Sequence, residues 1–430
     1  MNKITLVENC EFPASPGFIF GERKLLRRLG QFRKRERKLL TRLSRANAGK
    51  SIYARRKAMR ECQGSIAYRI CSAVDANKKL PGKRRICLAD LFEVADKLSW
   101  NVPTNEPVRV RGKTKLSGGE RAICNPAIRN RTMDEALAKV LTVNFKPKPF
   151  QYEYGGKGGI SQAIKDIASA VGHGYVWAAR LDVHRCFESF DGEALYKWLP
   201  LRRSVIDAHV VGDHMNVVVT STSLSIDEMI DQACRGVPQG SALSPKIAGM
   251  SVATLDWTSD LPLFNWVDDF LILGTTEEAV IEAAHTLIAK VSALPGGKFD
   301  LKLKSVCEAN DGIVFLGHRI QIFEDQVEIS PAFLDDFYGP LVAAELLICP
   351  SLYLPSFTPK LSKKEIFIVV ADMWVFAKSW AQAFSACDDI DDYLLSVEQS
   401  VKGHLHALGL TFEALDGYKN FDAEWTKHYS

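Results

Sequence analysis

The sequence predicts an α+β fold with an antiparallel sheet near the middle of the chain and helices toward both ends. Strand-like and helix-like segments are interleaved from residue 108 to residue 325, a pattern typical of α+β proteins. Residues 22–100 and 326–430 carry helical apolar spacing instead. Within the interleaved part, Asp268 and Asp269 interrupt an apolar run, which indicates a strand, a turn and a second strand. Two carboxylates at such a turn either hold a divalent cation or are simply solvated.

The composition is that of a soluble protein with more than one folding unit. The chain has 430 residues, of which 47% are hydrophobic and 25% charged, so a single compact domain is not expected. No run of about 18 apolar residues is present, so no membrane partner is expected. The N-terminal residues lack the apolar core of a signal peptide. The ten cysteines are scattered without a CxxC pair, which argues against a zinc ribbon and favours reduced thiols in the cytoplasm.

Basic charge is concentrated near the N-terminus. Of the 55 Lys and Arg residues, 16 lie between Glu22 and Arg60, where only two Glu occur. Apolar residues recur there at positions 25, 29, 32, 39 and 43, which predicts an amphipathic helix whose other face is basic. Such a face is either solvated or binds a polyanion, and this charge density favours a nucleic-acid backbone. The candidate RNA-binding residues are Arg27, Arg28, Arg33, Lys34, Arg35, Arg37 and Lys38.

Apolar periodicity and turn residues predict the elements that follow. Strands are expected in a basic hairpin over 108–123, over 177–183 and over 205–219. Helices are expected over 129–143, 161–171, after Gly240, and over 276–294, 363–387 and 394–408. The two aspartates therefore lie in a sheet region between helices.

Four more segments combine with the twin aspartate. Asp182 ends an apolar strand, and an aromatic residue, Phe187, follows five positions later. A glycine-rich turn over 236–245 opens a helix and exposes backbone N–H groups. Lys304 and the segment 315–318 come after the aspartates. This order and spacing resemble palm motifs A to E of the reverse transcriptases, and upstream 121–131 and 150–163 resemble fingers segments of the bacterial enzymes.

The resemblance covers roughly residues 108–320 and implies the right-hand architecture of these polymerases. Such an architecture has fingers, a palm with an antiparallel sheet and a helical thumb. The expected divisions are a basic helical N-terminal extension at 1–100, fingers at 101–180, a palm at 181–325 with a fingers insertion near 203–230, and a helical thumb at 326–430.

The three aspartates fit the chemistry of nucleotidyl transfer. Two divalent metals activate a 3′-hydroxyl and neutralise the triphosphate of a dNTP, and Mg²⁺ prefers carboxylate and carbonyl oxygens. The resemblance assigns catalysis to Asp182, Asp268 and Asp269, and metal binding to these three together with the backbone carbonyl of Val183. The expected cofactors are two Mg²⁺ ions, with Mn²⁺ as an alternative.

The resemblance also assigns residues that contact the nucleotide. Phe187 would lie under the sugar and exclude a 2′-hydroxyl, which argues for DNA synthesis over RNA synthesis, and a core aromatic is the alternative interpretation. Gln239 and the Gly240 backbone would touch the incoming nucleotide.

Basic residues are assigned to the phosphates on the same ground. Arg121, with Lys113 or Lys115, would bind the triphosphate from the fingers, and an exposed surface position is the alternative interpretation of either lysine. Lys304 would be a proton donor to pyrophosphate. The primer grip would consist of Phe315, Leu316, Gly317 and His318.

Within the family, the chain resembles the compact bacterial enzymes of the defence-associated "unknown group" and abortive-infection type, related to group II intron and retron reverse transcriptases. It has no Val-Thr-Gly block after 315–318, and leaves no room for RNase H, integrase, maturase or endonuclease modules. This resemblance implies an RNA template, a dedicated non-coding RNA partner, a DNA product and a role in antiphage defence. A homo-oligomer, or a second protein of the same defence system, is left open.

Three alternatives stand beside this interpretation. The same palm could carry out untemplated or protein-primed DNA synthesis. The chain could also be a group II intron-like or diversity-generating reverse transcriptase, against which the missing maturase domain and accessory partner argue. A non-catalytic RNA-binding scaffold has no need of three clustered acids, so Asp182, Asp268 and Asp269 speak against it.

Overall fold

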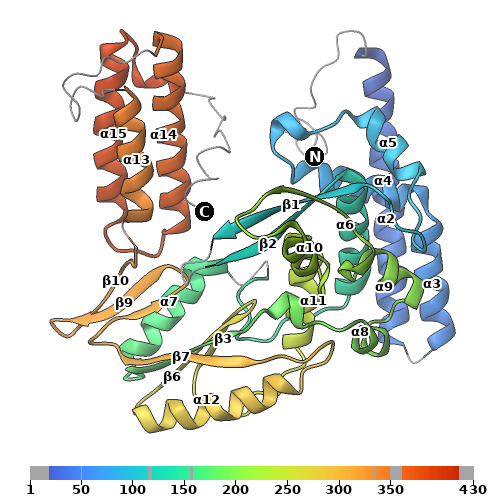
Figure 1. Ribbon diagram of the computed structural model, residues 1–430, viewed down its shortest axis with the longest axis horizontal. Helices are drawn as coiled ribbons and strands as arrows, with labels where there is room; N and C mark the ends of the chain where they lie inside the picture. The colour runs from blue at the N-terminus through green and yellow to red at the C-terminus, as the bar shows by residue number, and fades with distance from the viewer. Residues whose placement is uncertain are drawn as a thin grey trace. The chain divides into compact units, whose positions relative to one another are not determined.

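The computed structural model describes residues 19–49, 51–114, 119–154, 158–333, 335–348 and 361–415 (Figure 1). It is a mixed α+β fold, as predicted. The chain divides into two compact units, each built from several stretches of sequence. Unit 1 comprises Met1–Lys148, Val183–Trp257 and Leu287–Lys302, and unit 2 comprises Pro149–Asp182, Thr258–Thr286 and Leu303–Ser430.

Helices dominate the N-terminal part of unit 1. They are α2 (Ile19–Ala48), α3 (Ile52–Gly64), α4 (Ile66–Lys78), the short η1 (Gly82–Arg84), α5 (Leu88–Asp96) and α6 (Ile128–Thr142). The predicted amphipathic helix is confirmed, because Leu29, Leu39 and Leu43 of α2 are buried. Helix α2 packs on α3, α4, α5 and α6, so its apolar stripe faces the interior of this bundle.

Unit 1 also contains a three-stranded sheet. Strands β1 (Pro107–Thr114) and β2 (Glu120–Pro126) form the predicted basic hairpin, and β4 (Asn216–Ser221) lies parallel to β1. Helix α10 (Ile226–Cys234) covers this sheet through Met229 and Ala233. The other elements of the unit are η2 (Cys186–Ser189), α8 (Gly192–Trp198), α9 (Arg203–His209), η3 (Gly212–His214) and α11 (Ser244–Val252).

The prediction of strands throughout 205–219 is wrong for its first part. Residues Arg203–His209 form helix α9, and the strand β4 begins only at Asn216. Val205 and Ile206 are fully buried, and α9 packs on α6 and α8. Tertiary packing therefore overrides the strand propensity of a short β-branched run, which periodicity alone does not distinguish from a helix.

Unit 2 is organised around two sheets. The larger has the order β5-β6-β3-β7, from β5 (Leu263–Trp266), β6 (Asp269–Gly274), β3 (Trp177–Val183) and β7 (Leu301–Glu308). The smaller has the order β10-β9-β8, from β8 (Ile313–Phe315), β9 (His318–Phe323) and β10 (Gln326–Pro331). Helix α7 (Gly159–Gly172) packs Ile164 and Ile167 into the core that both sheets share, whereas α12 (Glu277–Ser292) begins in unit 2 and ends in unit 1.

Three long helices end the described chain. They are α13 (Asp335–Ile348), α14 (Lys363–Ala383) and α15 (Ile390–Ala407), followed by η5 (Phe412–Leu415). Among the described residues, α14 alone is long and apolar enough to cross a membrane, a criterion that core helices also meet. Its Val370, Ala377 and Trp380 side chains are buried in the helical bundle that α14 forms with α13 and α15 (Figure 1).

Candidate active site

Two of the predicted catalytic aspartates face each other across neighbouring strands of unit 2. Strands β3 and β6 are antiparallel, and their register pairs Asp182 with Asp269. Strands β5 and β6 form a hairpin in which Trp266 pairs with Asp269 across the turn residues Val267 and Asp268. The predicted strand, turn and strand are therefore confirmed, and the pairing brings two carboxylates to one edge of the sheet.

The hairpin turn has a strained backbone and is held by hydrogen bonds from Asn265. Val267 has φ +56°, a left-handed conformation that is uncommon for a β-branched residue and costs on the order of 1–3 kcal/mol. The buried amide of Asn265 donates to the carbonyls of Val267 and Asp269, both at 3.1 Å. The backbone of Asn265 also bonds to Phe150 and Tyr152. Asn265 is not among the predicted site residues, although a polar residue inside an apolar run is a signal that could have identified it.

Each of these two carboxylates has a basic partner within unit 2. Arg180 Nη2 lies 3.4 Å from Asp269 Oδ1, and Lys304 Nζ lies 3.1 Å from Asp182 Oδ2. Burial raises the pKa of Asp269, the charge of Asp182 raises it further, and Arg180 opposes both. The predicted Lys304 thus lies beside a predicted metal ligand, whereas Arg180 was missed although it precedes Asp182 by two positions on the same strand face.

The donor chemistry suits a hard divalent cation, because carboxylate oxygens are the ligands that Mg²⁺ prefers. Burial is the main cause of the raised pKa of Asp269, and the charge of Asp182 adds to it, so a cation beside both carboxylates would favour their ionised forms. The described residues contain no cluster of three or more His, Cys, Asp or Glu side chains already arranged for a metal. Asp182 and Asp269 instead contact Lys304 and Arg180 through one oxygen each. Val183, whose carbonyl was a predicted ligand, is the last residue of β3.

In unit 1, the glycine-rich turn is docked on two predicted nucleotide-binding segments. Gly236 has φ +67°, and a Cβ there would lie 2.3 Å from the carbonyl oxygen of Phe187. Gly240 has φ +106°, and a Cβ there would lie 2.2 Å from the Cys124 carbonyl oxygen on β2. Backbone bonds from Val237 to Phe187 at 3.0 Å and from Cys124 to Gln239 at 2.7 Å fix the contacts. Only glycine permits these approaches, so the turn holds Phe187 and Gln239 in place.

Positively charged side chains lie opposite each other in the hairpin of β1 and β2. Lys113 on β1 is directly opposite Arg121 on β2. Burial lowers the pKa of Lys113, and the charges of Arg121 and Arg111 lower it further. Like charges directly opposite each other destabilise a hairpin unless an anion lies between them. The pair is therefore a candidate for a phosphate contact. Lys115, the other predicted lysine, lies outside the described residues.

A buried acid that the sequence analysis did not single out supports the same turn. Asp134 on α6 is buried and accepts a hydrogen bond from Ser241 Oγ at 2.8 Å. Burial raises the pKa of Asp134 to about 7, although Ser241 and the charge of Arg131 act to lower it. Helix α6 therefore anchors the turn through a group that favours the protonated state.

The predicted primer-grip residues form the tight turn between β8 and β9 in unit 2. Leu316 and Gly317 occupy the turn with φ +48° and +79°. Phe315 and His318 are buried, and the His318 ring lies 4.7 Å from the Phe384 ring, centroid to centroid. Burial lowers the pKa of His318. The turn residues, rather than these two side chains, are the accessible part of the segment.

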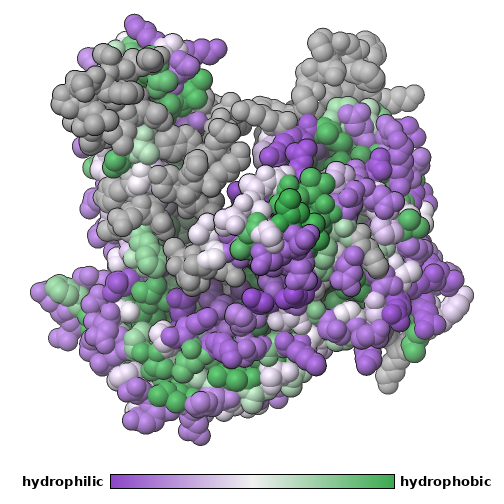
Figure 2. Space-filling view, in the orientation of Figure 1, coloured by the Kyte–Doolittle hydropathy of each residue, from purple (hydrophilic) through white to green (hydrophobic). Residues whose placement is uncertain are grey.

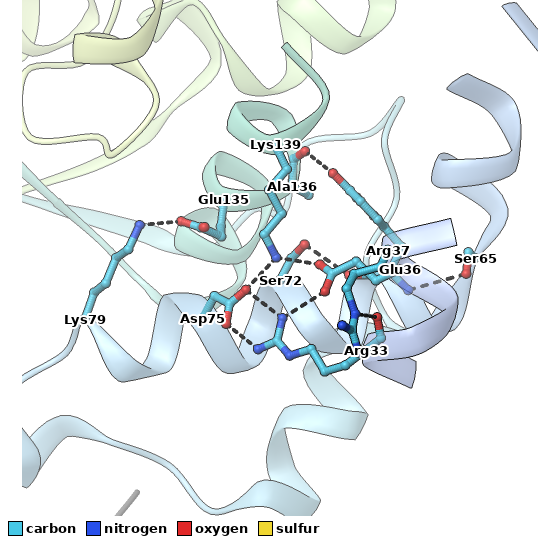
Figure 3. Close-up of polar contacts among 11 residues, drawn as sticks. Arg33, Glu36, Arg37, Ser65, Ser72, Asp75, Lys79, Glu135, Ala136 and Lys139 are labelled. Carbon is cyan, nitrogen blue, oxygen red and sulfur yellow. Dashed lines mark hydrogen bonds and ion pairs between the residues drawn. The ribbon is translucent and has the colours of Figure 1, made fainter. Parts of the chain in front are cut away.

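The basic face of α2 is largely exposed. Six of its seven predicted RNA-binding residues have exposed side chains, and Figure 2 shows mainly hydrophilic residues where α2 and α3 lie in Figure 1. Arg33 differs, because it is half-buried and bonds to Glu36 at 2.9 Å and to Asp75 of α4 (Figure 3). Lys139 of α6 reaches the same two acids at 2.6 Å (Figure 3). Internal ion pairs thus account for Arg33, and the other six cations face solvent.

No protein-family model matches the chain, and no curated protein matches it. Among solved structures, the fold is similar to telomerase from Candida albicans, solved with a TWJ fragment of telomeric RNA, with a TM-score of 0.35 and 11% identity over 75% of this chain and 67% of that one. It is also similar to apo telomerase from Candida tropicalis, with a TM-score of 0.34 and 11% identity over 75% of this chain and 61% of that one. The chain therefore matches less than two thirds of the length of the Candida tropicalis chain.

Proposed function

We propose that this protein is an RNA-directed DNA polymerase whose nucleotidyl-transfer site is the carboxylate edge of unit 2. The observation that carries the proposal is the pairing of Asp182 with Asp269 beside the strained Val267–Asp268 turn. Strain and like-charge pairs are costly in a fold and gather at functional sites. The motif order of the sequence supports the same assignment.

In this proposal, Asp182, Asp268, Asp269 and the carbonyl of Val183 would hold two Mg²⁺ ions, or Mn²⁺ in their place. When bound, such ions activate a 3′-hydroxyl and neutralise the triphosphate of a dNTP. Asn265 keeps the hairpin turn in one conformation through its two backbone bonds.

The remaining residues would bind and orient the nucleotide. Lys304 would release its proton to the pyrophosphate leaving group, because its ammonium already lies at the carboxylate edge. Arg121, Lys113, Gln239 and the Gly240 backbone would bind the nucleotide, and Phe187 would exclude a 2′-hydroxyl.

The template is proposed to be RNA, supplied as a dedicated non-coding RNA, and the biological role to be antiphage defence in the cytoplasm. The resemblance of the motifs supports this part, together with the exposed cations of α2. A homo-oligomer or a second defence protein would be a partner in the same system.

The test is to purify the protein from cells, extract its nucleic acid and sequence it, beside the Asp268→Ala/Asp269→Ala variant. We expect one discrete RNA together with complementary DNA, and loss of the DNA in the variant. DNA without a complementary RNA would indicate untemplated synthesis. DNA that persists in the variant would refute the catalytic assignment, and RNA without DNA in either protein would favour a binding scaffold.

A further inference from the structure

A groove in unit 1 is lined by a cluster of arginines. None of the site residues assigned above lines this groove. It lies between α3 and residues 200–202, which connect α8 to α9, and its volume is about 640 Å³. Four of the ten lining residues are arginines: Arg55, Arg56, Arg60 and Arg202. No Asp or Glu lines the groove. A concave surface of one charge sign concentrates counter-ions more strongly than a flat one.

The four arginines lack carboxylate partners within the described part of the chain. The nearby acid Glu61, also on α3, pairs instead with Arg42 of α2 at 3.3 Å. Arg55 in addition has a buried Nε atom that meets no acceptor among the described residues. A buried donor without an acceptor is costly and is usually satisfied by a ligand or by water. The groove therefore offers several donors to an anion with more than one charge.

Exposed apolar side chains stand at the start of the same helix. Tyr53 is 70% exposed and Ile52 is 63% exposed, and both line the groove. An exposed aromatic ring among arginines is the arrangement with which proteins bind an unpaired base and its flanking phosphates. A duplex would not present a free base face to Tyr53, so a single strand fits this surface better.

We propose that this groove binds a single strand of nucleic acid, with the arginines on its phosphates and one base stacked on Tyr53. The site goes beyond the proposed polymerase, because strand binding here requires none of the carboxylates of unit 2. It would hold a stretch of strand in addition to any contacts that α2 makes.

The test measures binding of a fluorescent oligouridylate of about 12 nucleotides across a range of salt concentrations. The variants are Arg56→Gln, Arg60→Gln and Tyr53→Ala. The matched controls are Lys57→Gln, which removes one exposed cation from α3 outside the groove, and Tyr53→Phe, which keeps the ring. All five substitutions change exposed side chains, so folding should be retained.

Each arginine variant should lower the slope of log K against log salt by about 0.7, because one phosphate contact is lost from a single strand. Tyr53→Ala should weaken binding by about fivefold or more, and Tyr53→Phe should not. A 4-thiouridine oligonucleotide should photo-cross-link to the peptide that holds Tyr53. Equal effects of Arg56→Gln and Lys57→Gln, or no cross-link to this peptide, would overturn the proposal.

Failure of this inference can be told apart from failure of the proposed function. The Asp268→Ala/Asp269→Ala protein should bind the oligonucleotide as the wild type does. If the groove variants bind normally while the wild type makes DNA, the groove assignment is wrong and the polymerase stands. If the groove binds while no DNA is made, the polymerase assignment is wrong and the groove stands.

Discussion

Replacing Glu36 with leucine tests whether α2 is held by apolar packing alone or also by the buried charges that the structure shows. Glu36 occupies the apolar stripe of α2, where spacing alone favours a leucine. Its side chain is only 6% exposed and accepts bonds from Arg33 at 2.9 Å and Lys139 at 2.6 Å (Figure 3). Asp75 completes a network of two acids and two bases. Glu36→Leu would leave two cations sharing the single carboxylate of Asp75, so we expect destabilisation.

The magnitude follows from burial. Removing one partner from a buried ion pair costs about 3–5 kcal/mol, and the low end applies here because Lys139 is 16% and Asp75 24% exposed. Burying the new leucine returns at most about 2 kcal/mol. The net cost is therefore about 1–2 kcal/mol. In Glu36→Leu/Lys139→Met one acid and one base remain, so the double variant should regain most of that loss.

The assay is hydrogen–deuterium exchange read by mass spectrometry over peptides of α2, α4 and α6. A local measurement is needed because the two-state approximation does not hold for multi-domain proteins, and this chain divides into two compact units. Exchange in α2 should be about tenfold faster in Glu36→Leu, since 1.4 kcal/mol is a factor of ten. Arg42→Gln, which breaks an exposed pair, should change exchange little. Slower exchange in Glu36→Leu, or no recovery in the double variant, would refute the reasoning.

Three other outcomes are expected. Burial raises the pKa of Asp134 to about 7, so the folded state keeps a proton that the unfolded chain loses near pH 4, and stability should fall from pH 4 to pH 7 by up to about 4 kcal/mol. Asp134→Asn lacks this titration, so the melting temperature of the variant should rise relative to wild type over that range, and a constant difference would contradict the burial argument. Lys304→Gln should lower kcat by about 100-fold, as expected for a lost general acid. The control Lys302→Gln removes a cation paired with Asp300 and should change kcat little. Equal effects of the two variants would refute the assignment of Lys304 as proton donor. Phe187→Ala should raise ribonucleotide incorporation relative to dNTPs by about tenfold or more, and unchanged discrimination in a primer-extension assay would refute the assignment of Phe187 to 2′-hydroxyl exclusion.

The sheet elements of the candidate site could be predicted because their signals are local. The strand Trp177–Val183 has the predicted limits, and the apolar run around Asp268 and Asp269 gave the hairpin. The contact between Lys304 and Asp182 could not be predicted in this way. It depends on β7 lying beside β3 in the order β5-β6-β3-β7, and the sequence order of strands does not determine their spatial order.

The long-range polar contacts also could not be predicted from the apolar periodicity of the sequence. Glu36 was visible only as an acid in place of an apolar residue, and its partner Lys139 lies 103 residues away. Asp134 belongs to an ordinary helical segment, and its contact with Ser241 spans 107 residues. A helical pattern tells which face is buried, whereas the partner of a buried charge depends on the packing of distant elements.

Helix α6 joins these two buried polar contacts, since Asp134 bonds to the glycine-rich turn and Lys139 bonds to α2 and α4. An apolar contact between α2 and α6 would tolerate a shift of one helix along the other. A shift of α2 along α6 would break the four-charge network, because each oxygen and nitrogen must lie within hydrogen-bond distance of its partner. The exposed cations of α2 and the turn that holds Gln239 are therefore joined to the same helix. If α2 contacts a nucleic acid, the position of that contact relative to the turn is set by α6, at the cost of burying charge.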